Sequence, residues 1–211
     1  MGGGFGFMAD NHFFIRKLHS LLGVIPVGLF LLEHLFTNSF ALKGAQAFNE
    51  KVEFFQSIPY LIFIELLLIF LPLLFHGIYG TWIVLTGESN VFQYRYYRNW
   101  FYWIQRLSGI ITLIFVIWHV WNTRLQTLFF GTEMSFEFMH NLLSNPVNAV
   151  LYAIGLIAAT FHFANGMWAF LVSWGITIGP KAQRTSTIIW SIFFIVITAV
   201  GLNALFGFIR G

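Results

Sequence analysis

Long apolar stretches alternate with shorter polar connections along the chain, and this pattern predicts most of its architecture. Five apolar segments stand out, at roughly 18–40, 60–86, 100–123, 147–175 and 187–209. Each is long enough to cross a bilayer as a helix, which satisfies its backbone polar groups within the segment. We therefore predict an all-α membrane protein with five transmembrane helices, forming one domain over residues 1–211. The Gly-rich residues 1–12 are expected to form a mobile tail.

Composition supports this class and narrows the possible chemistry. Hydrophobic residues make up 58% of the chain and charged residues 9%, so a soluble fold could not cover its apolar surface. There are no cysteines, which excludes disulfides, thiolate-bound iron–sulfur clusters and covalently attached c-type haem. The basic residues are scattered near segment ends rather than grouped in a patch. Membrane lipid, and no nucleic acid, is therefore expected around this protein.

The same basic residues predict the orientation, because cytoplasmic loops carry the excess of Lys and Arg. Seven lie on the N-terminal side of the membrane and four on the other: Arg16, Lys17, Arg95, Arg98, Arg106, Lys181 and Arg184 against Lys43, Lys51, Arg124 and Arg210. We expect a multi-pass protein of the cell membrane, with the N-terminus in the cytoplasm and the C-terminus outside. A signal peptide is the alternative for the first segment, but this segment runs on into Glu33 and His34 without a small-residue cleavage pattern.

The first four segments contain two tandem copies of a two-helix unit. Four residues recur 86 positions later: Phe75, His76, Gly80 and Trp82 return as Phe161, His162, Gly166 and Trp168. His34 and His119 lie 85 positions apart. The pattern predicts that the first four helices form a bundle from two related halves.

Four histidines lie inside the apolar segments, where an ionisable side chain is costly and indicates a functional site. Helical rise places His76 and His162 at one level in the cytoplasmic half, and His34 and His119 at another near the outer face. Four helices that each supply one imidazole, in pairs at two levels, match two stacked bis-histidine haems. Such sites transfer electrons rather than bind oxygen. Taken singly, each histidine could instead hydrogen-bond across a helix interface.

Two glycines lie one helical turn after the inner histidines, on the same helix face. Gly80 follows His76, and Gly166 follows His162. The missing side chains would let a flat porphyrin approach the backbone, so both glycines are candidate cofactor contacts.

Three further histidines lie at or beyond the segment ends. His19, at the cytoplasmic end of the first segment, is either a contact for a haem propionate or quinone, or an interfacial residue. His12 and His140 are expected to be solvated.

The motifs RKLHSLLGVIPVG, LPLLFHGIYG, RNWFYWIQRLSGIITLIFVIWHVW and FHFANGMWAF resemble those of a known family. They are similar to the cytochrome b membrane anchor of succinate:quinone oxidoreductase, of the single-polypeptide, two-haem type of Gram-positive bacteria. The resemblance extends over nearly the whole chain. It implies two b haems, a membrane quinone as electron acceptor, with menaquinone expected, and partnership with a flavoprotein and an iron–sulfur subunit in respiratory complex II.

Carried over by position, the resemblance also implies the haem ligands. His34 and His119 match the outer, low-potential haem, and His76 and His162 match the high-potential haem on the cytoplasmic side. Helical depth gives the same pairing. Glu33 is an acid where a neutral polar residue would be expected, which alters the charge beside the outer site.

Quinone reduction needs protons as well as electrons, and Glu65 is a candidate catalytic proton carrier. It lies six residues after Pro59, at about the depth of the outer histidines. Alternatively, Glu65 is protonated and only hydrogen-bonded between helices. Arg106, at the cytoplasmic end of the third segment, either pairs with a haem propionate or acts as a positive-inside anchor.

Three other functions remain open on the sequence. The same anchor could serve a quinol:fumarate reductase, since an anchor does not set the direction of the reaction. A His-relay proton or solute transporter without haem would need a connected polar chain between the two histidine levels, where the sequence offers almost only Leu, Ile and Phe. A purely structural anchor would need none of the histidines. The chain carries no dehydrogenase active site, so alone it should not oxidise succinate.

Overall fold

The computed structural model describes the backbone of residues 3–211 and the side chains from His12 onward. All secondary structure in this part of the chain is helical, and five segments are long and apolar enough to cross a membrane: His12–Lys43, Leu61–Thr86, Tyr97–Phe130, Pro146–Ser173 and Gly179–Arg210. The predicted all-α class and the five spans are confirmed. The tail predicted for residues 1–12 begins outside the described residues, and the backbone is helical from Gly3.

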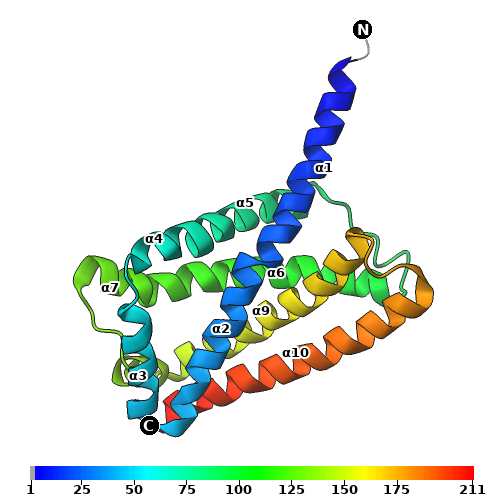
Figure 1. The fold of residues 1–211 in the computed structure, drawn as a ribbon. Helices are drawn as coiled ribbons and strands as arrows, with labels where there is room; N and C mark the ends of the chain where they lie inside the picture. The colour runs from blue at the N-terminus through cyan, green and yellow to red at the C-terminus, as the bar shows by residue number, and fades with distance from the viewer. Residues whose placement is uncertain (1–2) are drawn as a thin grey trace.

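The first span is built from three consecutive helical pieces. They are α1 (Gly3–Val24), α2 (Pro26–Asn38) and the 3₁₀ turn η1 (Ser39–Lys43). Pro26 has no backbone N–H and its ring crowds the preceding turn, so α1 ends just before it. The chain nevertheless continues along one diagonal across the molecule (Figure 1).

The second and third spans are interrupted as well. The second comprises α4 (Leu61–Glu65), the π-helical turn η2 (Leu66–Phe70) and α5 (Leu71–Thr86). The third comprises α6 (Tyr97–Asn122) and α7 (Arg124–Phe130), which meet at Thr123. A π-helical turn inside a helix frequently marks a functional position, and here it directly follows Glu65.

The fourth and fifth spans are single helices that pack along each other. Helix α9 (Pro146–Ser173) starts with Pro at its first turn and with the Asn145 side chain accepting a hydrogen bond from the Val147 N–H. It lies between α6 and α10 (Gly179–Arg210), and α10 also packs along α2 and η1 (Figure 1). At Gly207, an added Cβ would lie 3.0 Å from the Ala41 backbone, so glycine permits this close approach.

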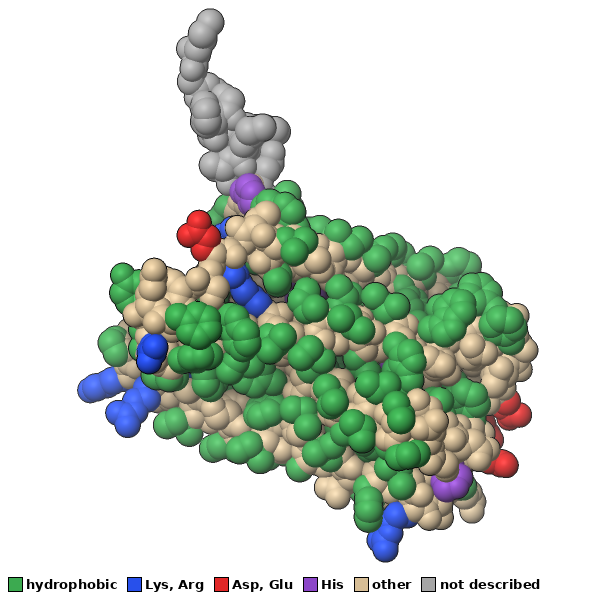
Figure 2. Space-filling model, turned by 180° about the vertical axis from the view of Figure 1, so that it is seen from behind, with side chains coloured by type: hydrophobic (Ala, Val, Ile, Leu, Met, Phe, Trp, Pro, Cys, Tyr) green, Lys and Arg blue, Asp and Glu red, His purple; other side chains and the backbone are tan. Residues whose placement is uncertain are grey.

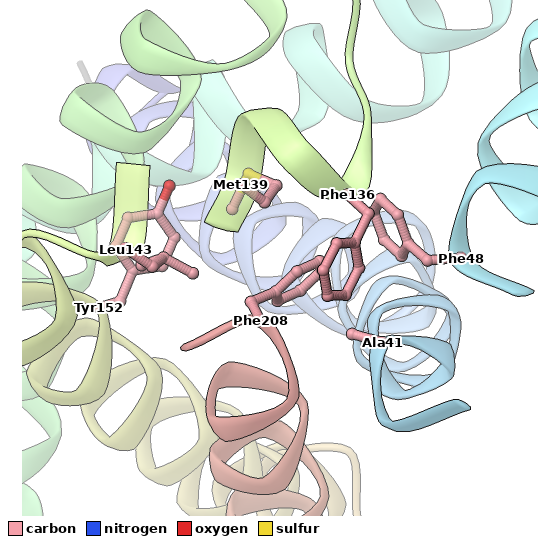
Figure 3. Packing of buried hydrophobic residues seen from close by; sticks show 7 residues of the cluster. All are labelled: Ala41, Phe48, Phe136, Met139, Leu143, Tyr152 and Phe208. Atoms are coloured by element: carbon pink, nitrogen blue, oxygen red, sulfur yellow. The ribbon is translucent and has the colours of Figure 1, made fainter. Parts of the chain in front are cut away.

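Two short helices in the outer connections were not predicted from the sequence. They are α3 (Ala45–Gln56) and α8 (Phe136–Leu143), and they cover one end of the bundle. Their apolar side chains form a buried cluster with residues of η1, α9 and α10 (Figure 3): Ala41, Phe48, Phe136, Met139, Leu143, Tyr152 and Phe208. His140, which was expected to be solvated, is partly exposed, and its Nδ1 donates to the Phe208 carbonyl at 2.7 Å.

The surface has the polarity of a protein surrounded by lipid. Large apolar side chains point outward along the spans; Leu67, Ile117 and Ile195, for example, are each more than half exposed. Figure 2 shows a broad hydrophobic band between two ends at which charged side chains gather. The chain is therefore a multi-pass membrane protein. His12, at the start of the first span, is exposed as expected.

Candidate functional site

Four spans converge on a cavity of about 320 Å³. Its walls come from α1, α5, α6 and α9, the helices that carry the two copies of the repeat. Six of the residues singled out in the sequence line it: His19, His76, Gly80, Arg106, His162 and Gly166. Residues distant in the sequence thus meet around one space.

The two inner histidines face each other across this cavity. The ring centres of His76 and His162 are 6.1 Å apart, with the ring planes nearly perpendicular. His76 Nδ1 lies 2.9 Å from the backbone oxygen of His19, and His162 Nδ1 lies 3.1 Å from that of Gln105. A carbonyl can only accept, so each Nδ1 is the donor. Each Nε2 is then left with a free lone pair.

Glycines stand directly against both inner rings. An added Cβ on Gly23 would lie 2.4 Å from the His76 ring, and one on Gly109 would lie 2.8 Å from the His162 ring. Both distances are too short for any side chain, so these positions require glycine if the rings keep their places. Sequence reasoning missed this pair, although the two glycines are also 86 positions apart.

Gly80 and Gly166 line the cavity, but their nearest neighbours are other side chains. An added Cβ on Gly80 would lie 3.2 Å from His19 Nε2, and one on Gly166 would lie 3.3 Å from Gln105 Nε2. Gly80 therefore leaves room for the side chain of His19, and Gly166 leaves room for the side chain of Gln105.

His19 and Gln105 occupy the same position in the two halves of the repeat, 86 residues apart. The His19 ring stacks on His76, with ring centres 4.1 Å apart and planes within 6°. Its Nε2 is buried and has no hydrogen-bond partner among the described residues. The Gln105 side chain instead donates to the backbone oxygen of His162 at 3.0 Å. Aligning HSLLG with QRLSG would have found this correspondence.

Arg106 lies at the rim of the cavity. Its Nη1 donates to the Glu88 carbonyl at 3.2 Å, Nη2 donates to the Tyr102 hydroxyl, and the guanidinium lies over the Tyr102 ring. Its Nε is buried without a hydrogen-bond partner among the described residues. This arginine, which lines the cavity, thus has one donor without a partner among the described residues.

The outer histidines also form a pair, at the other end of the same four spans. The ring centres of His34 on α2 and His119 on α6 are 5.8 Å apart, with planes at 72°. His119 Nδ1 lies 3.1 Å from the Tyr152 hydroxyl. Tyr152 also belongs to the buried cluster beneath α3 and α8. This tyrosine, which the sequence reasoning missed, connects the outer pair to the covered end of the bundle.

Two acids lie near the outer pair, each with a partner. Glu33 accepts a hydrogen bond from Thr37 one turn later, at 2.5 Å. Glu65 Oε2 accepts from both Nε and Nη2 of Arg124, at 2.9 and 2.6 Å. The side chains of Arg124 and Glu65 are 26% and 16% exposed. Glu65 is thus held by two hydrogen bonds from an arginine, a partner that the sequence did not identify.

The donor set limits what could bind at either level. Within the described residues, no three His, Asp or Glu side chains gather as a metal site. Each level offers two imidazoles facing each other. Such a pair suits a metal whose remaining ligands are supplied by a cofactor rather than by the protein.

Comparison with known proteins finds related membrane subunits. A family model described as the succinate dehydrogenase/fumarate reductase transmembrane subunit matches residues 88–202. The succinate dehydrogenase cytochrome b558 subunit of Bacillus subtilis (strain 168) is 48% identical over 200 residues, which cover 95% of this chain and 98% of the relative. The family model spans the second copy of the repeat and most of α10, whereas the relative spans both copies.

Proposed function

The chain belongs to the family of cytochrome b membrane anchors of succinate dehydrogenase, and from this premise we propose that it binds two b haems and passes electrons to membrane quinone. The inner haem would be held by His76 and His162 and the outer haem by His34 and His119. The single observation that carries this proposal is the spacing of the two histidine pairs.

That spacing is the one that two axial ligands need. Metal–imidazole bonds of about 2 Å, with about 1.1 Å from each nitrogen to its ring centre, put two axial imidazoles roughly 6 Å apart. The ring centres are 6.1 Å apart in the inner pair and 5.8 Å in the outer pair. The residues present therefore fit haem b, which would supply reversible one-electron chemistry at its iron when bound.

The protein's own groups prepare the inner histidines for this role. Because the backbone oxygens of His19 and Gln105 fix the proton on Nδ1, the Nε2 of each ring is available as the ligand. Because Gly23 and Gly109 have no side chains, the His76 and His162 rings can lie directly against α1 and α6. Arg106 Nε and His19 Nε2 are buried donors or acceptors beside the cavity, suited to a propionate or quinone oxygen.

We place quinone chemistry near the outer pair, with Glu65 as the proton-carrying residue. Glu65 ends α4 at the π-helical turn η2, which packs against α2, the helix of His34. Arg124 holds the carboxylate in position, five residues after His119. Quinone reductase activity of Glu65→Gln tests this role: a fall in turnover with both haems intact is expected, and unchanged turnover removes Glu65 from the mechanism.

The proposed assembly follows the family. A flavoprotein subunit and an iron–sulfur subunit would dock on the cytoplasmic side, where the seven basic residues lie, with the N-terminus inside and the C-terminus outside. Electrons from succinate would then arrive at the inner pair and leave at the outer pair, with menaquinone as the expected acceptor. The same anchor could serve quinol:fumarate reduction, since the direction depends on the quinone potential and on the partner subunits.

The experiment is purification from membranes, followed by a reduced-minus-oxidised spectrum and subunit analysis. We expect a b-type α-band, two haems per chain, and copurification of a flavin-containing and an iron–sulfur subunit. A protein without haem would overturn the proposal and favour a His-relay transporter or a purely structural anchor. One haem per chain would overturn the assignment of two ligand pairs.

A further inference from the structure

We propose that Gln105 is a positioning residue for His162, held in place by Asn165 and Arg98 in a polar chain whose counterpart in the first half of the repeat consists mainly of ring contacts. This inference rests on the proposed function, because it concerns how one of the two inner ligands is held. It makes the two inner histidines inequivalent, although the repeat gives them matching backbone surroundings.

Gln105 and His162 are joined by two hydrogen bonds that run in opposite directions. The ring Nδ1 of His162 donates to the backbone oxygen of Gln105 at 3.1 Å. The side-chain Nε2 of Gln105 donates to the backbone oxygen of His162 at 3.0 Å. Together the two bonds fix the position of α9 along α6 and its rotation about its own axis, so that the imidazole meets its carbonyl acceptor. Gly166 leaves the space that the amide needs.

A chain of side chains holds the Gln105 amide in this orientation. Asn165 Nδ2 donates to Gln105 Oε1 at 2.8 Å, and Arg98 Nη1 donates to Asn165 Oδ1 at 3.5 Å. Arg98 also donates to Thr187 on α10, and its guanidinium lies 3.5 Å from the ring centre of Trp168. Because Oε1 is engaged as an acceptor, the amide must present Nε2 to His162. Helix α10, which carries no histidine, thereby contributes to holding a ligand.

The equivalent positions in the first half make a different structure. Arg98, Gln105, Asn165 and Trp168 correspond, 86 residues earlier, to His12, His19, Tyr79 and Trp82. These four rings contact one another in sequence, with centres 5.1 Å apart for His12 and Trp82, 5.3 Å for Trp82 and Tyr79, and 5.5 Å for Tyr79 and His19. His19 then stacks on His76. Both ligands donate Nδ1 to a backbone oxygen, but the first half adds ring stacking around His76, whereas the second adds side-chain hydrogen bonds around His162.

The two arrangements predict different responses to substitution. A hydrogen bond to Nδ1–H makes an imidazole a stronger donor to the metal, which favours the oxidised state. Removing the Gln105 amide or its partner Asn165 should weaken the hydrogen bond from His162 Nδ1 to the Gln105 backbone oxygen. We therefore expect the midpoint potential of the inner site to rise and its low-spin EPR signal to shift, while the outer site keeps both properties.

The test compares Gln105→Leu and Asn165→Leu with Thr112→Val in the purified complex. Thr112 lies two turns further along α6, and its hydroxyl has no hydrogen-bond partner among the described residues. Potentials are measured by redox titration followed by EPR and optical spectra. Gln105→Leu should give the larger rise at the inner site, Asn165→Leu a smaller rise in the same direction, and Thr112→Val none.

The outcomes separate this inference from the proposed function. An inner potential and EPR signal that stay at the wild-type values in both leucine variants would overturn the positioning role of Gln105. If Gln105→Leu fails to assemble, Asn165→Leu decides, since it keeps the Gln105 side chain and removes only its partner. A wild-type protein without b-type haem would instead overturn the proposed function.

Discussion

The inner and outer histidine pairs have similar spacing but are held by different parts of the protein. In the inner pair, both Nδ1 atoms donate to backbone oxygens, and glycines lie against both rings. In the outer pair, His119 contacts the Tyr152 hydroxyl, and within the described residues no hydrogen bond joins either ring to a backbone carbonyl. The inner geometry is therefore fixed by the main chain, and the outer geometry by side chains.

This difference follows from the register of the repeat. The inner ligands, their glycines and their carbonyl partners all recur at a spacing of 86 residues, whereas His34 and His119 are 85 apart. The shift by one residue coincides with the break between α1 and α2 at Pro26, whereas α6 is continuous, so the outer ligands do not keep the register that the inner ones share. Duplication thus accounts for the symmetry of the inner site, while the outer site depends on residues particular to each half.

The largest effect is expected from removing one ligand at each level. His162→Ala should eliminate the inner haem, and His119→Ala the outer haem, each lowering the α-band absorbance by about half because one of the two proposed haems is lost. Redox titration of each purified variant should show the loss of one component. The inner variant should also reduce the yield of folded protein more, because four helices meet at that cavity.

The control for this pair is His140→Ala, which removes an imidazole from α8 outside the spans. It should leave both redox components in place. If His162→Ala and His119→Ala each remove the same redox component, the assignment of the two histidine pairs to separate haems is wrong.

The glycines give a graded test of the inner site. An alanine Cβ would lie 2.4 Å from the nearest described atom at Gly23, 2.8 Å at Gly109, and 3.2 and 3.3 Å at Gly80 and Gly166. Overpacking of this kind typically costs about 1–3 kcal/mol. Inner haem content should therefore fall most in Gly23→Ala, less in Gly109→Ala and least in the other two, measured as the inner component of a redox titration of each purified variant.

The order of these effects also tests the idea that Gly80 and Gly166 give a porphyrin access to the backbone. If Gly80→Ala and Gly166→Ala lose as much inner haem as Gly23→Ala, the cofactor itself must lie against them. Outer haem content is the internal reference, since all four substitutions lie on the inner side.

Tyr152→Phe is expected to act on the outer site alone, with a moderate effect. It removes the hydroxyl that contacts His119 Nδ1 and keeps the ring in the buried cluster. A hydrogen bond of this kind contributes about 1 kcal/mol, and its loss should raise the outer midpoint potential while the inner one stays constant. A shift at the inner site instead would contradict the separation of the two levels.

The sequence predicted the spans and the histidine pairs well, because both depend on local patterns. Hydropathy marks each span, and helical rise gives the depth of each ring. It did not reveal α3 and α8, whose short apolar faces, such as Phe48 and Met139, become recognisable only when packed against other helices. The Tyr152 and Gln105 contacts were missed for the same reason: each joins residues on different helices, and spacing along one helix carries no information about them.

The smallest effect on stability is expected from the Glu65–Arg124 pair. Measuring it shows whether a loss of quinone reductase activity in Glu65→Gln reflects quinone chemistry or a less stable fold. The pair is partly exposed, so its coupling should be about 0.2–1 kcal/mol. A double-mutant cycle of Glu65→Gln, Arg124→Gln and the combined variant measures it from unfolding in mixed micelles. Both haem spectra should be unchanged in all three, because neither residue contacts a histidine ring by hydrogen bond. A coupling of several kcal/mol would mean that the pair is a buried structural element, and a loss of turnover in Glu65→Gln would then follow from misfolding rather than from a missing proton carrier.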